Sequence, residues 1–320
     1  MPRVPREVLT KWAPLLVLLT LVILFTALNP TFFSLRNFAR IAIASAPALM
    51  VAIGVTFVIL MGSIDLSMEG AISLTAVLFC YAFLGVGGSL LPWGWLAVPA
   101  TLALGGLIGA LNGLIHVRLR IPSFMASLAL GFIGTGAAVL LTGGDIVRIE
   151  DEAFRGLLTV RWFGFPIMVW VAGLGLAVAW FIQSRTTLGR NFYAVGGGED
   201  LAHASGVDVA RVRILGFALA GVFYAVAAIL VLGRIGQAES VSGSGFMFIS
   251  ITSAVVGGVA LWGGVGGVWN ALVGVLIVGV INNGMVVIGL PDFLQQGVLG
   301  LLVIVAVVLS TDRRSVSFVK

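Results

Sequence analysis

The side chains best suited to chemistry gather in one polar interval between Gln183 and Ile214. Its ionisable members are Arg185, Arg190, Glu199, Asp200, His203, Asp208, Arg211 and Arg213. Within it, the stretch from Glu199 to Gly206 is typical of one short helix that a glycine ends. The sequence on both sides is almost entirely apolar, so we expect this interval to meet a soluble partner rather than lipid.

A second group of polar residues lies in the segment GSIDLSMEG, which places Asp65 and Glu69 between two long apolar runs. A carboxylate at the centre of a bilayer costs about 2.5 to 3.5 kcal/mol, so this pair must face water, protein or the interface. One interpretation is that Asp65 or Ser67 caps a helix whose first turn holds Glu69. The other is a broken helix that lines a solute path, where irregular backbone is shielded from lipid.

Three asparagines fall inside apolar runs, at Asn112, Asn282 and Asn283. Their default role is interhelical hydrogen bonding, at about 0.6 kcal/mol each, and the alternative is contact with a solute. Together with Asp65 and Ser67, they are our candidates for a translocation path.

The residues that are missing exclude several kinds of chemistry. A phosphate-binding loop needs a lysine after a glycine-rich turn, but the two lysines are Lys11 and Lys320. His116, His203 and Cys80 provide no plausible zinc or haem site, and Cys80 is expected to be a packed apolar side chain. We therefore expect no catalytic residue, no bound metal or cofactor, and no ATPase activity in this chain.

The composition fixes the class of protein. Hydrophobic residues make up 60% of the chain, charged residues 10%, and the mean hydropathy is +1.15. This leaves too little polar surface to cover a soluble globule. The net charge of +5 does not form a basic patch interleaved with aromatics, so nucleic acid is not an expected partner.

We therefore predict an all-α, polytopic membrane protein that forms a single transmembrane domain over residues 1–320. A membrane helix needs about 20 apolar residues. Cutting the chain at its polar and glycine-proline breaks predicts about ten helices, the first of them a retained span rather than a signal peptide. They cover residues 12–28, 41–61, 66–86, 93–115, 121–142, 164–182, 214–232, 246–262, 265–287 and 293–309.

The distribution of positive charge predicts the orientation. With both termini cytoplasmic, 12 of the 18 basic residues lie inside: Arg3, Arg6, Lys11, Arg118, Arg120, Arg185, Arg190, Arg211, Arg213, Arg313, Arg314 and Lys320. The positive-inside rule favours this arrangement. The polar interval, about 184–213, is then a cytoplasmic loop. The loop at about 143–163 is external, either simply solvated or a surface that receives an external partner.

Glycine spacing predicts two packing features. Gly105, Gly109 and Gly113 are four residues apart, so they share one helical face that another helix can approach closely. The run 263–267 is expected to be a compact cytoplasmic turn, since it has no lysine or helix-start serine that would suit a phosphate.

Four segments, in this order, resemble the motifs of the ribose-type permeases of bacterial sugar ABC importers. They are GSIDLS at 62–67, LNGLIHVRLRIPSFMASLAL at 111–130, TTLGRNFYAVGGGEDLAHASGV at 186–207, and AVVGGVALWGGVGGVWNALVGVLIVGVINNG at 254–284. The resemblance runs from about residue 29 to residue 311.

The resemblance implies a permease subunit in the bacterial inner membrane that imports a monosaccharide. It implies two cytoplasmic ATPase subunits that use ATP and Mg, a second permease copy or paralogue, and an external sugar-binding protein. The polar interval resembles the segment that couples a permease to its ATPase. On that match, the ATPase-coupling residues are Glu199, Asp200, Ala202, Ala204, Ser205 and Gly206, and Glu199 is expected to pair with a basic residue of the partner.

The sequence departs from the family pattern at two points. Asp200-Leu201 stands where a double alanine is usual, and Ser63 replaces a glycine in GSIDLS. An importer permease for branched-chain amino acids is the nearest alternative. An ion-coupled secondary transporter would need coupling-ion sites near the midplane, often in inverted repeats, and the sequence has no clear repeat. A channel or scaffold protein is a further alternative, which copurification with an ATPase would exclude.

Overall fold

The computed structural model describes residues 6–291, 293–295, 297–298, 300–301 and 304. Its helices are α1 (Arg6–Leu28), α2 (Leu35–Leu60), α3 (Met68–Gly85), α4 (Ala97–Leu119), α5 (Ser123–Thr142), α6 (Glu152–Thr159), α7 (Ile167–Arg185), α8 (Thr187–Gly197), α9 (Glu199–Ala204), α10 (Val209–Ile235), α11 (Phe246–Val256) and α12 (Val268–Val287). Short 3-10 turns lie at η1 (Pro30–Phe32) and η2 (Gly94–Leu96). The strands are β1 (Val147–Arg148), β2 (Arg161–Trp162), β3 (Phe165–Pro166) and β4 (Gln237–Ala238).

The all-α membrane class predicted from composition is confirmed. Seven helical segments among the described residues are long and apolar enough to span a membrane: 35–60, 68–85, 94–119, 123–142, 167–185, 209–235 and 268–287. Two shorter apolar helices cover 12–28 and 246–256. Nine of the predicted spans therefore coincide with helices, although the one predicted at 246–262 ends at Val256. The tenth, 293–309, lies largely outside the described residues, and the cytoplasmic placement of the termini stays a prediction.

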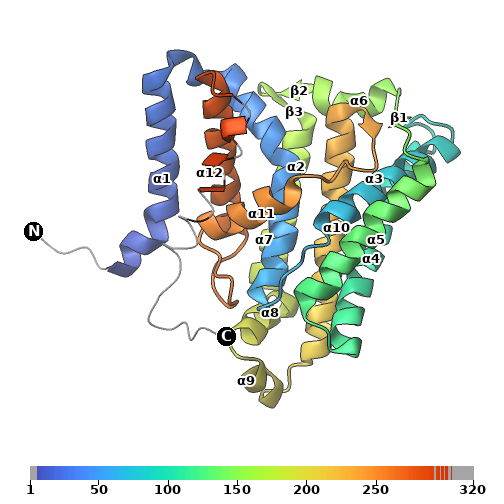
Figure 1. Cartoon of the computed structure of the whole chain (residues 1–320), viewed down its shortest axis with the longest axis vertical. Helices are drawn as coiled ribbons and strands as arrows, with labels where there is room; N and C mark the ends of the chain where they lie inside the picture. The colour runs from blue at the N-terminus through green and yellow to red at the C-terminus, as the bar shows by residue number, and fades with distance from the viewer. Residues whose placement is uncertain (1–5, 292, 296, 299, 302–303, 305–320) are drawn as a thin grey trace, which may run out of the picture.

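Helix α2 forms the centre of the molecule. Its most apolar stretch is 89% buried inside the protein. It packs against α10, α12, α11 and α7. Figure 1 shows α1 and α12 on one side of α2, and α3, α4, α5 and α10 on the other. Because α2 is almost entirely apolar after Arg40, it is suited to this enclosed position.

The predicted glycine stripe of α4 is confirmed, and its partner is α10. A Cβ atom at Gly105 would lie 2.5 Å from the carbonyl oxygen of Gly221, and one at Gly113 would lie 2.8 Å from the Cα of Ile214. A Cβ atom at Gly109 would meet the carbonyl of Phe217. The absence of side chains on this face lets the two backbones touch, which joins α4 and α10 closely.

Two helices begin inside the bundle rather than at its surface. After α2 ends at Leu60, the chain makes a turn at 61–62 and runs without regular secondary structure over 63–67 before α3 starts. Helix α11 has only 11 residues and lies between the segments 236–245 and 257–267. Backbone breaks of this kind are stable in a membrane protein only where other protein surrounds them.

The loop predicted at 143–163 is partly folded. It contains α6, which Asp151 caps by accepting a hydrogen bond from the backbone N–H of Phe154 at 2.7 Å. Phe154 is buried against Phe79 and Phe83 of α3. β1 pairs with β4, and β2 pairs with β3. A fully solvated loop is therefore the wrong description, because this segment packs over the end of the bundle (Figure 1).

Candidate functional site

The polar interval forms the end of α7, then α8, α9 and the start of α10, at the end of the bundle away from α6 (Figure 1). Thr186 caps α8, since its Oγ1 accepts a hydrogen bond from the N–H of Gly189 at 3.2 Å. Helix α9 ends as predicted at a glycine: Gly206 has φ +83° and donates its N–H to the carbonyl of His203 at 2.9 Å. The sequence-predicted short helix with its glycine stop is thus confirmed.

The predicted coupling residues do not all face outward. Glu199, Asp200, Ala204, Ser205 and Gly206 are exposed. By contrast, Ala202 is 4% exposed and packs against its own chain. Helix α9 also presents Leu201, which is 75% exposed.

Leu201 was not among the coupling residues predicted from the motif. The only sequence signal for it was its position where the family pattern has alanine. An exposed leucine at the tip of a polar helix is the kind of side chain that a partner protein can bury.

Glu199 pairs within its own chain. Its Oε2 lies 2.7 Å from the Nη2 of Arg213, at the start of α10. The expectation that Glu199 binds a basic residue of a partner is therefore not what this structure shows. The pair is half-exposed on the carboxylate side, and exposed pairs contribute about 0 to 1 kcal/mol, so a partner could replace Arg213 at little cost.

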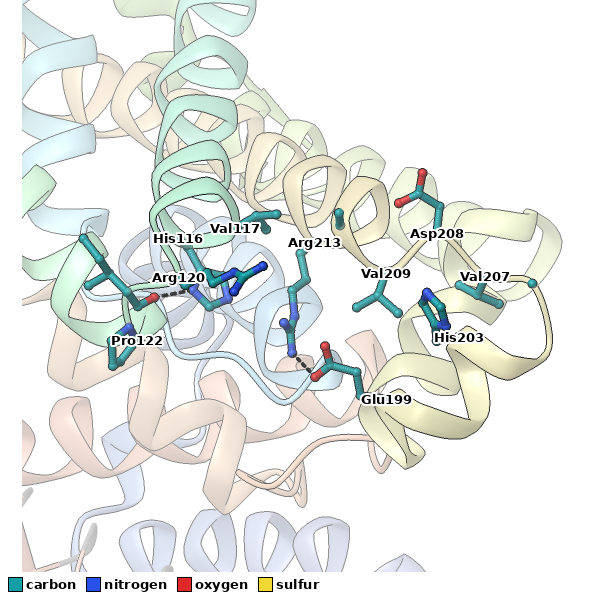
Figure 2. A pocket seen from close by; sticks show the side chains of 13 residues that line it. His116, Val117, Arg120, Pro122, Glu199, His203, Val207, Asp208, Val209 and Arg213 are labelled. Carbon is teal, nitrogen blue, oxygen red and sulfur yellow. Dashed lines mark hydrogen bonds and ion pairs between the residues drawn. The ribbon is translucent and has the colours of Figure 1, made fainter.

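A pocket of about 860 Å³ lies between α9 and the turn that joins α4 to α5. Figure 2 shows His116, Arg120 and Pro122 on one side of it, and His203 and Asp208 on the other. The Nδ1 of His116 lies 2.6 Å from the carbonyl oxygen of Ile121. Because a carbonyl oxygen only accepts hydrogen bonds, Nδ1 is the ring nitrogen that carries the hydrogen and acts as the donor. The pocket leaves open space behind α9, on the side away from the solvent-facing Leu201.

Helix α8 connects the polar interval to the two non-helical segments at 61–67 and 257–267. It does so through a backbone contact that we call the glycine junction, which is formed by Gly62, Gly196, Gly263 and Gly264. The N–H of Gly264 donates to the carbonyl of Leu60 at 3.0 Å. A Cβ atom at Gly196 would meet that same carbonyl and would lie 2.6 Å from the nitrogen of Gly264. The turn predicted at 263–267 is confirmed, and its glycines let three backbones meet.

Two side chains reinforce the glycine junction. The Tyr193 hydroxyl donates to the carbonyl of Gly266 at 2.7 Å, and burial raises the pKa of this phenol, which keeps it protonated as a donor at neutral pH. The Oε1 of Gln183 accepts the N–H of Val268, the first residue of α12, at 2.8 Å. These bonds hold α7 and α8 against the segment that leads into α12.

Three of the five predicted path residues come together in a buried polar cluster. Asp65 is 2% exposed. Its Oδ1 accepts hydrogen bonds from the N–H and hydroxyl of Ser67, at 2.9 and 2.6 Å, and from Asn112 at 3.2 Å. Its Oδ2 accepts the hydroxyl of Tyr224 at 3.0 Å, a residue that sequence reasoning missed. The cluster ties the non-helical segment before α3 to α4 and α10.

Glu69 lies in the first turn of α3, as predicted, and it also stabilises a second helix. Its Oε1 accepts the N–H groups of Gly245 and Met247 at 2.9 and 3.2 Å. Its side chain therefore stabilises the N-terminus of α11. The predicted cap of α3 is corrected instead, because Ser67 stands at the N-cap and makes no side-chain capping hydrogen bond. The two helices that begin inside the bundle are joined at their starts.

Asn282 and Asn283 lie apart from this cluster. They line a second pocket, of about 390 Å³, between α2, α11 and α12. Neither side chain makes a hydrogen bond to another residue in the part of the chain that the structure describes, so the predicted interhelical bonds are not found.

The described residues contain no group of three His, Cys, Asp or Glu side chains that could hold a metal ion. Cys80 is free and buried in α3, as expected of a packed apolar side chain.

The chain was compared with known proteins. A family model described as the permease component of the branched-chain amino acid transport system matches residues 37–307. The ribose import permease protein of Escherichia coli K12 is 32% identical over 304 residues, which cover 94% of this chain and 93% of that protein. The L-arabinose transport system permease protein of the same strain is 33% identical and covers 93% and 89%, and its D-allose counterpart is 29% identical and covers 93% and 91%. No solved structure matches.

The family match covers most of the chain, and the relatives align along nearly their full lengths. With its apolar helices, the chain is a multi-pass protein of the bacterial inner membrane. It belongs to the permease family of the branched-chain amino acid transport system, the superfamily that also holds these ribose, arabinose and allose permeases.

Proposed function

We propose that this chain is the transmembrane permease subunit of an ABC importer for a monosaccharide. Separate ATPase subunits bind ATP and Mg and supply the energy. The observation that carries the proposal is the position of α9. It is exposed at one end of the bundle, and α8 joins it to the two backbone breaks at 61–67 and 257–267. This arrangement suits a protein that receives movement from a partner.

The substrate class rests on the relatives. Three of them are named for the transport of ribose, L-arabinose and D-allose, which supports a monosaccharide here. The family description supports branched-chain amino acids as the alternative substrate. Competition between labelled ribose and unlabelled leucine in whole-cell uptake separates the two, because only a true competitor lowers uptake.

The mechanism is alternating access driven from α9. Closure of the ATPase pair pushes α9, and α8 carries the movement to the glycine junction. There it shifts the carbonyl end of α2 against the start of α12, which changes the relative tilt of the helices that flank both breaks. The buried cluster at Asp65 keeps its segment attached to α4 and α10 during this movement, so we assign Asp65, Ser67 and Asn112 a positioning role.

The surface that meets the ATPase consists of the outward side chains of α9. Leu201 supplies apolar area, and burying a leucine contributes about 1.5 to 3 kcal/mol. Asp200, Ala204 and Ser205 surround it, and Ala202 stabilises α9 from within. At the opposite end, α6 and the two short sheets form the surface for an external sugar-binding protein. A second permease copy or paralogue completes the importer.

Gly206 allows a direct test of this coupling role. Replacing it with valine is expected to lower ATP-driven uptake about tenfold, because a β-branched residue at φ +83° costs on the order of 1 to 2 kcal/mol and shifts the end of α9. ATP hydrolysis by the assembled importer should continue. Uptake and hydrolysis are measured together in proteoliposomes.

Gly206→Asn is the matched control. Asparagine adopts left-handed backbone readily, and no atom lies within 4 Å of the site for a Cβ, so uptake should stay near wild type. Unchanged transport by Gly206→Val, with normal assembly, would remove α9 from the coupling path.

A further inference from the structure

The pocket of about 390 Å³ near Asn282 and Asn283 lies at the end of the bundle opposite α9. Arg40 is near the start of α2, Arg234 is in the last turn of α10, and the asparagines are near the end of α12. The opposite ends of the same helices, namely the end of α2 and the starts of α10 and α12, lie near α8 and α9. If α9 faces the cytoplasm, this pocket therefore belongs to the outer half of the protein. Its volume is within the range of small-molecule sites, about 300 to 1,000 Å³.

The pocket contains polar atoms that have no partner. Ser45 is 7% exposed and lines the pocket, and its buried Oγ makes no hydrogen bond. The buried Oδ1 of Asn283 has no partner either. Buried polar atoms are nearly always satisfied by protein, water or ligand. These two oxygens, with Asn282 and Ser244 beside them, offer acceptors to the hydroxyl groups of a solute.

The same pocket holds two guanidinium groups without a carboxylate. Neither Arg40 nor Arg234 forms an ion pair or side-chain hydrogen bond with any residue that the structure describes. A planar guanidinium binds a carboxylate through two parallel hydrogen bonds, and it does so more strongly than it binds a neutral hydroxyl. Two such groups on the wall of one pocket favour a ligand with a negative charge.

We propose that this pocket is a solute subsite for a monosaccharide-sized ligand that carries a carboxylate, that is, a sugar acid. Its hydroxyls bind Ser45, Asn282 and Asn283, and its carboxylate binds Arg40 and Arg234. The inference rests on the proposed importer function and narrows its substrate class from monosaccharides in general to acidic ones.

The test uses two sugars that differ only in the carboxylate, D-galacturonate and D-galactose. Binding of each is measured by equilibrium dialysis to the full chain with its ATPase in phosphatidylcholine nanodiscs. We expect galacturonate to bind at least tenfold more tightly than galactose. Arg234→Gln and Arg40→Gln should each remove most of this preference for galacturonate. Asn283→Leu should weaken the binding of both sugars. Arg118→Gln, an exposed arginine in the last turn of α4 outside the pocket, is the matched control and should change nothing.

Equal binding of the two sugars, or a preference that survives both arginine substitutions, would overturn the inference. An anionic lipid headgroup is the other source of negative charge. If phosphatidylglycerol in the nanodisc abolishes the Arg234-dependent binding of galacturonate, the arginines serve lipid and the solute subsite is wrong. ATP-driven uptake of galactose without any ATP-driven uptake of galacturonate would sink this inference but not the importer function.

Discussion

Replacing Gly196 with alanine is expected to abolish most ATP-driven uptake, whereas the same change at Gly197 leaves uptake near wild type. The two residues are neighbours at the end of α8. A Cβ atom at Gly196 would meet the carbonyl of Leu60 and lie 2.6 Å from the nitrogen of Gly264, while at Gly197 nothing lies within 4 Å. Added methyl groups in packed sites cost about 1 to 3 kcal/mol, so the glycine junction must open and the population of the coupled state should fall about 10- to 100-fold.

The direction of the change in each of the two variants tests the glycine junction. In a helix, alanine is normally about 1 kcal/mol more favourable than glycine, so Gly197→Ala should be neutral or slightly stabilising. Uptake is measured in proteoliposomes, and copurification with the ATPase shows whether assembly is intact. If Gly196→Ala transports as well as Gly197→Ala, the glycine junction does not carry movement from α8 to α2.

Replacing Asp65 with alanine is expected to destabilise the protein by about 3 kcal/mol or more. The change leaves three buried donors without their acceptor, namely the N–H and hydroxyl of Ser67 and the hydroxyl of Tyr224, while the amide of Asn112 keeps only its bond to the Oγ of Ser67 at 3.3 Å. Each unsatisfied buried polar group costs about 1 to 3 kcal/mol, although the donors that find water lose less. Thermal unfolding of the purified chain in detergent measures the loss.

Two further variants give a graded comparison. Tyr224→Phe removes one of the four hydrogen bonds and should cost about 1 kcal/mol. The loss of stability in Asp65→Asn should fall between those of Tyr224→Phe and Asp65→Ala. The asparagine amide can donate to the hydroxyl of Tyr224 while its carbonyl still accepts from Ser67. If Asp65→Ala unfolds at the same temperature as the wild-type protein, the positioning role of the buried cluster is contradicted.

The features that were predictable from the sequence are local ones. Apolar runs of membrane length gave the helices, and the acidic start and glycine end of 199–206 gave α9. The four-residue glycine spacing in α4 gave a face for close helix packing, since neighbours on a helix follow from its period. The partner of that face, α10, has no signal in the spacing itself.

The features that were not predictable depend on contacts between distant parts of the chain. Glu69 caps α11 across 176 residues, and Tyr224 reaches Asp65 across 159. The glycine junction needs residues from α2, α8 and the turn before α12. Local patterns mark Glu69 as a residue of a helix's first turn and Gly263 as a turn residue, but they do not say which distant segment each one meets.

The predicted path residues divide for the same reason. Asp65 and Asn112 share a closed cluster in which both carboxylate oxygens accept hydrogen bonds. Asn283 instead lines an open pocket with unpaired arginines. Residue type alone treats these polar side chains as equivalent, and only the fold separates those that hold the structure from those that are free to bind a solute.

The central claim is that this chain is moved by a partner that hydrolyses ATP. The direct measurement is uptake of a panel of labelled monosaccharides, namely ribose, arabinose, allose and galacturonate, into proteoliposomes that hold the chain, its ATPase and internal ATP, with the binding protein outside. We predict uptake that requires internal ATP and continues after ionophores collapse all ion gradients. Uptake that proceeds without ATP, and stops when a proton or sodium gradient is removed, would contradict the account and identify an ion-coupled transporter.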